Sequence, residues 1–506
     1  MSCCAQSDRG FPTHMDHKMS QDAGGPSGPK EEQTIAVGVV SANEEKWWID
    51  PASPPEATRF AQSCESLFES GEGVLALQRV LETLSVHGND WQLSLAGASL
   101  VMRYTTRYDI VDVLLRNVLR LQPDNVQAQS SSAHLSIARG DIAGGCARFA
   151  EMIARYPGKK IEIGEYITMS LLEVGYPSEA LEILKYLLGA GNVSASLLNN
   201  LGCALERLNR STEALPWYEK ALQLSPERPE IVFGYACTLI KAGQFEKGWP
   251  VYFERALQLS KIQNWLRGMP RLRPDTELSG KRVLLFQEQG LGDTLQFIRH
   301  VPVLLARGAD ISLHVPKSLV RLMRMSFPAI TVLEPDPISE GDLYDYVAPI
   351  PDLPYLTNVH SIGDVPAKVP YLVAKTEDTA RFEASLPQKK PRIGLVWAGE
   401  RRSRSEFALA DMRRSVSFED MTKALLPVEA SLVNLQFGVE RKSLAEWQGQ
   451  EICDPMGAVQ DMADTAALMQ GLDLIISVDT SPVHLAGALG RCVAHQPMGR
   501  VLALGG

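Results

Sequence analysis

Two short stretches of the chain combine the residue types that a group-transfer site needs. The first is Gly290-Leu291-Gly292-Asp293, which follows one apolar run and precedes an amphipathic one. Glycines at such a turn allow close backbone approach, and the amides of the following helix attract an anion. Asp293 is then either the N-cap of that helix or a general base that takes a proton from an acceptor hydroxyl. The spacing alone leaves both interpretations open.

The second stretch covers residues 479–487, where an apolar run ends at Asp479 and a helix is expected to start. Thr480 and Ser481 open this helix, and His484 lies one turn after Thr480 on the same face. Hydroxyl groups, free amides and the positive end of a helix suit a diphosphate, and His484 can add a donor. The alternative is a capped helix whose histidine packs against a sheet.

A third candidate is the loop between Gly399 and Ser415, which contains Arg401, Arg402, Arg404, Arg413 and Arg414. Arginine binds pyrophosphate through fork-like hydrogen bonds. A solvated loop accounts equally well for Arg401, Arg402 and Arg404. Arg414 and Ser415, next to an expected helix start, are therefore the stronger candidates.

Alternating strand-like and helical runs after residue 281 predict the elements that position these groups. Strands are expected at residues 281–286, 311–315, 331–335, 344–350, 392–397, 431–437 and 472–478, and helices at 294–306 and 461–470. The pattern is typical of two doubly wound α/β units. Because such folds bind ligands at the carboxyl ends of their strands, the candidate residues are expected to face one another across a cleft between the units.

Upstream of these units the chain shows helix pairs with a fixed period. Pro123 and Pro157 stand 34 residues apart, which is the tetratricopeptide period. In the clearest copy, residues 195–228, the small, aromatic and terminating positions are Gly202, Ala214, Ala221, Tyr218 and Pro226. We expect five or six repeats, whose concave face binds a peptide or whose array only spaces or dimerises the protein.

Composition excludes several classes of function. The 506 residues include 50 Lys and Arg against 60 Asp and Glu, and a net charge of -10 disfavours nucleic acid as a partner. No apolar run is long enough to span a membrane, and residues 1–10 do not resemble a signal peptide. The eight cysteines follow neither a disulfide framework nor a zinc pattern, so free thiols in the cytoplasm, and no metal, are expected.

These observations predict five segments. They are a disordered leader (1–57), a tetratricopeptide array (58–262), a linker (263–280), a first Rossmann-like unit (281–387) and a second (388–506). Pro-, Gly- and Ser-rich composition defines the leader, and the Pro and Gly content around residues 270–280 defines the linker.

Several strings resemble a known family. They are QEQGLGDTLQFIRHVPVLLARGA, IGLVWAG, RRSV, LVNLQ and DMADTAALMQGLDLIISVDTSPVHLAGALGR. They look like bacterial tetratricopeptide-repeat proteins that carry a C-terminal GT-B glycosyltransferase domain. The catalytic region is similar to that of the ADP-heptose lipopolysaccharide heptosyltransferases, and the architecture is similar to that of protein O-linked N-acetylglucosamine transferases. The resemblance covers about residues 195–491.

The resemblance implies an inverting, metal-independent transferase that moves a sugar from a nucleotide sugar, its donor substrate, to an acceptor hydroxyl of a protein or glycan. It implies no resident cofactor. It makes Asp293 the catalytic base and places the donor against Gly290, Gly292, Gly399, Arg414, Ser415, Gln436, Asp479, Thr480, Ser481 and His484.

Relatives continue past the position of Arg491 with a further strand, so the second unit is expected to be incomplete after about residue 491, and we hypothesise a reading-frame shift there. A non-catalytic tetratricopeptide adaptor with a degenerate transferase domain is the alternative function. Homo-oligomerisation is left open.

Overall fold

A computed structural model describes residues 55–69, 72–189, 193–255, 257, 266, 268–333, 344–399, 414–425 and 428–496. Helix α1 begins at Pro55, so the last three residues of the predicted leader are helical and the rest lie outside the described residues. Among the described helices, none combines the length and apolar character that crossing a membrane requires.

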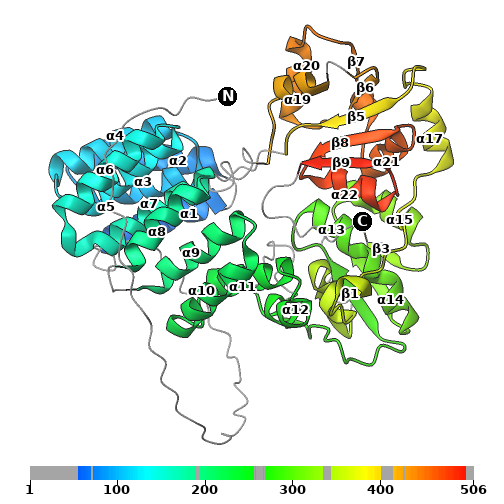
Figure 1. The fold of residues 1–506 in the computed structure, drawn as a ribbon, viewed down its shortest axis with the longest axis horizontal. Coiled ribbons are helices and arrows are strands. Elements are labelled where there is room, and N and C mark those ends of the chain that lie inside the picture. The colour runs from blue at the N-terminus through cyan, green and yellow to red at the C-terminus, as the bar shows by residue number, and fades with distance from the viewer. Residues whose placement is uncertain are drawn as a thin grey trace, which may run out of the picture. The chain divides into compact units, whose positions relative to one another are not determined.

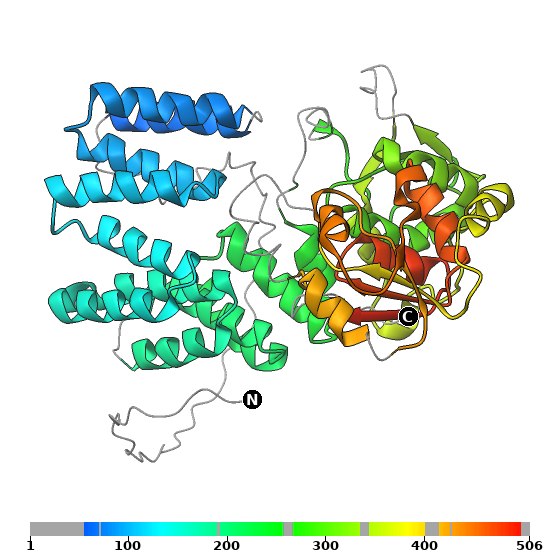
Figure 2. The same cartoon turned by 90° about the horizontal axis from the view of Figure 1, so that it is seen from above.

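The N-terminal part is a stack of helix pairs, coloured blue to green in Figure 1 and seen from above in Figure 2. The described residues contain six pairs, at the upper end of the predicted number. The helices are α1 (Pro55–Glu69), α2 (Gly73–Val86), α3 (Trp91–Tyr104), α4 (Tyr108–Leu121), α5 (Val126–Ala138), α6 (Ile142–Arg155), α7 (Lys160–Val174), α8 (Pro177–Leu188), α9 (Ala195–Arg207), α10 (Ser211–Leu224), α11 (Pro229–Lys241) and α12 (Phe245–Phe253). The short 3-10 helix η1 (Pro157–Lys159) precedes α7.

Close packing of small residues against Tyr218 explains why the repeat sequence forms this stack. Tyr218 on α10 is 1% exposed. A Cβ atom added to Gly202 of α9 would lie 2.6 Å from its ring, and one added to Gly234 of α11 would lie 2.9 Å from it. Ala214 and Ala221, the other predicted small positions, are fully buried. The spacing therefore predicts the helix packing as the structure has it.

The segment predicted as a linker packs against the first α/β unit. The amide of Leu272 donates to the carbonyl oxygen of Val347 at 2.9 Å, and Leu272 and Leu278 are each 1% exposed. Part of the predicted linker is thus core, because its leucines have apolar partners that the sequence pattern does not reveal.

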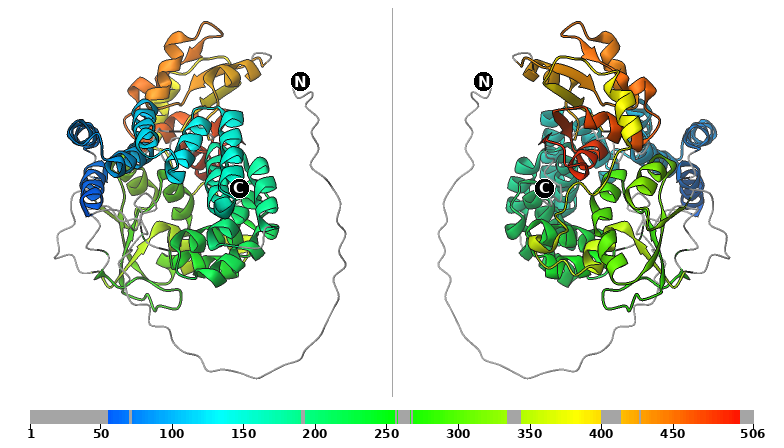
Figure 3. Two further views of the ribbon diagram at one scale, coloured as in Figure 1. Left: turned by 90° about the vertical axis from the view of Figure 1, so that its left-hand side faces the viewer. Right: turned by 90° about the vertical axis from the view of Figure 1, so that its right-hand side faces the viewer.

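The remaining chain forms two parallel sheets, coloured green to red in Figure 3. The first has the order β3-β2-β1-β4, with strands β1 (Arg282–Phe286), β2 (Asp310–His314), β3 (Thr331–Leu333) and β4 (Tyr346–Pro349). The second has the order β7-β6-β5-β8-β9, with β5 (Arg392–Val396), β6 (Ser431–Asn434), β7 (Ile452–Cys453), β8 (Leu474–Val478) and β9 (Val493–Gln496).

Helices connect the strands. In the first unit they are α13 (Leu291–Phe297), η3 (Ile298–His300), α14 (Val301–Ala306), α15 (Lys317–Ser326), η4 (Ile350–Asp352), α16 (Leu353–Leu356) and η5 (Ile362–Asp364). Those after residue 375 are α17 (Thr376–Glu383), α19 (Phe418–Leu425), η6 (Val439–Lys442), α20 (Ser443–Glu446), η7 (Pro455–Ala458), α21 (Met462–Gln470) and α22 (Ser481–Ala488). Both faces of β1 are covered, since Val283 and Leu285 join the main core while Leu284 and Phe286 pack with Leu266 on the other side.

Strand order defines where each sheet would bind a ligand. In the first sheet the chain proceeds from β1 to β3 in one direction and then places β4 on the other side of β1. In the second sheet it proceeds from β5 to β7 and then places β8 on the other side of β5. Such reversals are the topological switch points of doubly wound folds, where ligands bind at the carboxyl ends of the strands.

The second sheet extends past residue 491, where we expected it to be incomplete. Val493–Gln496 forms β9, which pairs in parallel with β8 from Ile475 to Val478. The run Val-Ala-His-Gln alternates too little to signal a strand, and the pairing depends on the free edge of β8. Residues 497–506 lie outside the described residues.

Candidate functional site

The loop after β1 carries the first candidate residues into α13. This helix begins at Leu291, three residues earlier than predicted, and Gly290 is its N-cap. Asp293 is therefore not the N-cap that one interpretation made it. Its Oδ2 instead accepts the backbone N–H of Gly290, three residues earlier, at 3.0 Å. A helix break also differs from the prediction, since the 3-10 turn η3 separates α13 from α14.

The surroundings of Asp293 raise its proton affinity. Burial is the main cause and raises the pKa of its carboxyl group to about 6, although the side chain is not completely enclosed. The backbone hydrogen bond from Gly290 opposes this rise, and the carboxylates of Asp479 and Glu288 add to it. A carboxylate with a pKa near neutrality and some exposure is suited to accept a proton.

The second candidate stretch forms the start of α22. Thr480 is its N-cap with an extended backbone, and Ser481 is its first residue. The Thr480 hydroxyl donates to the carbonyl oxygen of Val478 at 3.3 Å, so it does not cap the helix as the alternative interpretation expects. The amides in the first turn of a helix lack intrahelical partners, and this end of α22 carries partial positive charge.

The two candidate turns lie against each other. A Cβ atom added to Gly292 would lie 2.7 Å from Cδ2 of His484, so the His484 ring packs directly on the glycine backbone. The Nε2 atom of His484 lies 3.9 Å from Oδ1 of Asp479, and Asp479 in turn acts on the pKa of Asp293. Helices α13 and α22 pack together. A carboxylate, an imidazole and a helix start therefore meet where the β1 and β8 loops end.

Gly399, Arg414 and Ser415 form a second group at the end of β5. The amide of Gly399 donates to the Ser415 hydroxyl at 3.3 Å. A Cβ atom on Gly399 would lie 2.4 Å from Nε of Arg414, so the guanidinium packs on the glycine backbone. Because Val396 of β5 is in register with Ser477 of β8, this group lies at the same sheet edge as the start of α22. The four other candidate arginines, at 401, 402, 404 and 413, lie outside the described residues.

Gln436 is placed at this edge, but its amide group is fully engaged by the protein backbone. Its Oε1 accepts the N–H groups of Trp397 and Ala398 at 3.0 and 2.9 Å. Its Nε2 donates to the carbonyl oxygens of Ala398 and Phe437, both at 2.9 Å. A glutamine amide has two donors and two acceptor lone pairs, so none remains for a ligand. Gln436 is a positioning residue here, which differs from the donor contact that the resemblance implies.

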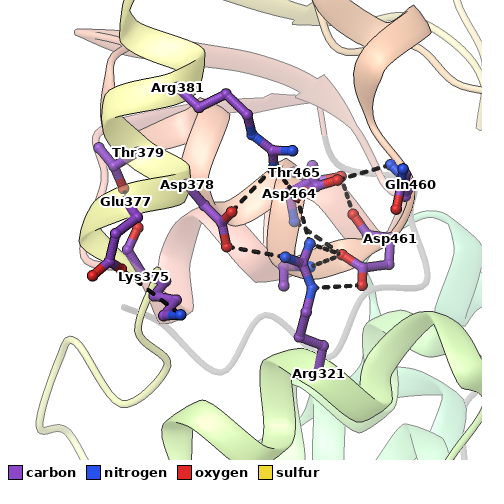
Figure 4. A network of polar contacts seen from close by, with 11 residues as sticks. Arg321, Lys375, Glu377, Asp378, Thr379, Arg381, Gln460, Asp461, Asp464 and Thr465 are labelled. Atoms are coloured by element: carbon purple, nitrogen blue, oxygen red, sulfur yellow. Dashed lines mark hydrogen bonds and ion pairs between the residues drawn. The ribbon is translucent and has the colours of Figure 1, made fainter.

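Sequence reasoning missed a network that joins α15 of the first unit to α17 and α21 (Figure 4). Arg321 on α15 donates to both carboxylate oxygens of Asp461, at 2.8 and 2.7 Å, and to Asp378 at 3.0 Å. It also pairs with Asp464, which accepts a further bond from Arg381 at 2.6 Å. Hydrogen bonds from Arg321 help to lower the pKa of Asp461 below its ordinary value. The partners are up to 143 residues apart, so no local pattern could have revealed them.

A second network that the sequence did not reveal surrounds Arg255, just after α12. Its guanidinium group pairs with Glu288 at 2.7 Å and with Asp352 at 2.6 Å, and Arg271 pairs with Asp352 at 2.7 Å.

The exposed side chain of Phe437, 71% accessible, is a third feature that the sequence did not reveal, at the sheet edge beside Gln436. Within the described residues, no group of three or more His, Cys, Asp or Glu side chains is arranged to hold a metal ion.

The site combines four groups with three chemical capacities. Asp293 can accept a proton, the start of α22 can hold an anion, and His484 and Arg414 can donate hydrogen bonds to it. Of the predicted residues, the structure brings Gly292, Asp293, Asp479 and His484 together. It places Gly399, Arg414, Ser415 and Gln436 at the neighbouring strand ends.

Comparison with known proteins identifies the repeats. Residues 119–261 match the family model described as Tetratricopeptide repeat. The curated protein FlbA of Caulobacter vibrioides is 27% identical over 394 residues, covering 65% of this chain and 64% of FlbA. The chain thus matches a little under two thirds of that relative. The array is a tetratricopeptide-type solenoid.

Solved structures of repeat proteins resemble the array only loosely. A tetratricopeptide repeat protein from Parabacteroides merdae is 16% identical, with a TM-score of 0.31, covering 36% of this chain and 71% of that one. Yeast Tom70 is 15% identical, with a TM-score of 0.34, covering 38% of this chain and 42% of that one.

Proposed function

We propose that this protein is a glycosyltransferase that moves a sugar from a nucleoside-diphosphate donor to an acceptor hydroxyl. The observation that carries the proposal is the packing of His484 on Gly292, which joins the Asp293 turn to the start of α22. Both turns lie at switch-point strand ends, the position at which doubly wound folds bind ligands. The resemblance of the GLGD and VDTSPVHLAGALG strings to GT-B transferases points to the same chemistry.

The proposed reaction is a single displacement. The acceptor oxygen attacks the anomeric carbon while the bond from that carbon to the diphosphate oxygen breaks, and Asp293 takes the acceptor proton. Negative charge develops on the departing diphosphate, where the positive end of α22, Ser481, His484 and Arg414 stabilise it. Attack opposite to the leaving group inverts the anomeric carbon. These groups supply the stabilisation without a metal ion.

In this proposal the repeat array selects a protein or peptide acceptor, and the enzyme works in the cytoplasm. The second candidate function is a protein-interaction adaptor whose α/β part does not catalyse transfer. The match of residues 119–261 to the repeat model favours this candidate independently of the site. The two functions differ in whether the α/β part binds a nucleotide.

Calorimetric titration separates the two. UDP, ADP, GDP, CDP and inorganic pyrophosphate are titrated in a buffer containing a metal chelator. The transferase should bind at least one nucleotide, and His484→Ala should weaken that binding about tenfold through loss of a donor to the diphosphate. His360→Ala is the matched control because His360 is exposed and lies in another loop.

A second variant tests the catalytic assignment. Asp293→Asn should retain nucleotide affinity within about twofold and abolish sugar transfer, because the amide cannot accept the acceptor proton. Absence of binding by every nucleotide would support the adaptor. Normal turnover by Asp293→Asn would show that Asp293 is not the catalytic base. Its carboxylate would then have only a structural role, as the acceptor of the Gly290 amide.

A further inference from the structure

The end of the repeat array makes direct polar contacts with the loop that leads to Asp293. The Nε2 atom of Gln289 donates to the Tyr252 hydroxyl at 2.6 Å, and Tyr252 belongs to α12. Arg255, two residues after α12, donates to Oε2 of Glu288 at 2.7 Å. Two adjacent loop residues are therefore held by two residues of the last repeat.

The ion pair between Arg255 and Glu288 is buried, so it is stable only when its charged groups are accurately placed. The side chains of Arg255 and Glu288 are 3% and 1% exposed, and that of Asp352 is fully enclosed. Buried charges are costly unless their partners are correctly placed, so each ion constrains the positions of the others. Arg271 supplies the second positive charge, which balances the two carboxylates.

Aromatic packing holds α12 against the other end of the same segment. Trp249 of α12 is 1% exposed and meets the ring of Phe297, the last residue of α13, edge to face at 6.2 Å. The Arg255 guanidinium lies 4.2 Å from the centroid of the Tyr252 ring. Helix α12 thus contacts the segment both before and after Asp293.

Glu288 and Gln289 are close to Asp293 in the sequence, so the contacts that hold them also restrict the position of Asp293. Gln289 precedes Gly290, and the amide of Gly290 is the donor to the Asp293 carboxylate. A loop that moves at Glu288 and Gln289 must move this amide as well. The Glu288 carboxylate also acts directly on the proton affinity of Asp293.

We propose that Tyr252 and Arg255 are positioning residues through which the last repeat sets the conformation of the Asp293 turn. The repeat array and the candidate site are then one mechanical unit at this junction. A ligand that displaces α12 would change the turn, and a ligand that orders the turn would stabilise α12, because coupling between sites is reciprocal. This coupling is independent of whether the site transfers a sugar.

Amide hydrogen exchange of the full chain tests the coupling. Tyr252→Phe keeps the buried ring and its packing on Trp249, and removes only the hydroxyl that Gln289 binds. Exchange in residues 287–293 should become about fivefold faster, the factor expected from loss of one ordinary hydrogen bond. Tyr218→Phe is the matched control, since it removes a buried hydroxyl from the same array at a place without contact to this loop.

A double-variant comparison separates positioning from general destabilisation. Gln289→Leu removes the same bond from the loop side, so it should accelerate exchange as Tyr252→Phe does, and the double variant should exchange no faster than either single one. Unchanged exchange at 287–293 in Tyr252→Phe would overturn the proposal. Equally fast exchange at 287–293 in Tyr218→Phe would also overturn it. So would exchange in the double variant that is faster by the product of the two single effects.

Discussion

Replacing Asp293 by Asn should stabilise the protein at neutral pH and have little effect in acid. Burial raises the pKa of the Asp293 carboxyl group from its ordinary value of 3.8 to about 6. The folded state therefore binds the proton more tightly than the unfolded chain does. Stability that this group contributes is present below about pH 4 and is lost as the pH rises through about 6.

The size of the effect follows from the shift. The difference between 3.8 and about 6 corresponds to about 3 kcal/mol of destabilisation above neutrality, at about 1.36 kcal/mol for each unit by which the pKa is raised. This shift already includes the opposing hydrogen bond from the Gly290 amide, and the neutral Asn side chain still offers an oxygen to that amide. Asn should therefore gain about 3 kcal/mol at pH 8, which raises the unfolding midpoint by roughly 6–12 °C for a cooperative unit of 150–250 residues.

Scanning calorimetry of Asp293→Asn and the unmodified protein, at several values between about pH 4 and pH 8, measures this. The difference between midpoints should be small near pH 4 and reach a plateau above about pH 7. Asp364→Asn is the matched control of opposite sign, because the Ser361 hydroxyl and the amides of Ser361 and His360 lower the pKa of Asp364. It should destabilise at pH 8 and about equally down to pH 4, because its lowered pKa keeps the carboxylate charged over this whole range. A pH-independent shift in Asp293→Asn would refute the reasoning.

Three further substitutions have defined outcomes. Gly292→Ala places a Cβ atom 2.7 Å from the His484 ring, so the ring must move, and calorimetry should show about tenfold weaker pyrophosphate or nucleotide binding. Arg321→Gln removes the bond pair to Asp461; because the Arg321 side chain is 38% exposed, the loss should be only about 1–2 kcal/mol, read as a lower thermal midpoint. Gly202→Ala places a Cβ atom 2.6 Å from the Tyr218 ring and should cost about 1–3 kcal/mol, read as earlier loss of helical circular dichroism on heating.

Controls for these variants come from exposed positions. Gly158→Ala serves both glycine variants, because no atom lies within 4 Å of its added Cβ. Arg116→Gln serves Arg321→Gln, since Arg116 is 69% exposed in its pair with Asp112 and should contribute little. Equal effects in a variant and its control would contradict the assigned contact.

The sequence predicts the elements well where the signal is local. The run at 392–397 becomes β5, and the period-34 positions around Tyr218 pack as expected. Apolar runs and small residues at helical spacing depend only on neighbours in the chain. The residue types at the ends of the expected strands also predict the turns after β1 and β8, because glycines and hydroxyl residues at strand ends mark such turns.

What could not be predicted depends on tertiary partners. Helix α13 starts at Leu291 rather than Thr294, and the Gly290 amide, which precedes it, donates to the Asp293 carboxylate. From the spacing alone, Asp293 could equally well accept amides that follow it, as an N-cap does. Arg255 has its carboxylate partners 33 and 97 residues away. Strand β9 needs the edge of β8. Each of these contacts exists only once the chain has folded.

The side chain of Gln436 supports the second sheet without an ionisable group. Its amide extends the hydrogen bonding between β5 and β6 past their last residues, because it links the backbones of Trp397, Ala398 and Phe437. An amide carries no ionisable proton, so these hydrogen bonds are the same in acid and in alkali. The site thus combines a carboxyl group that changes charge near neutrality with a supporting residue whose bonds do not depend on pH. A glutamate at position 436, although similar in shape, would lose both donated bonds, and the support of the sheet would then depend on pH as the charge of Asp293 does.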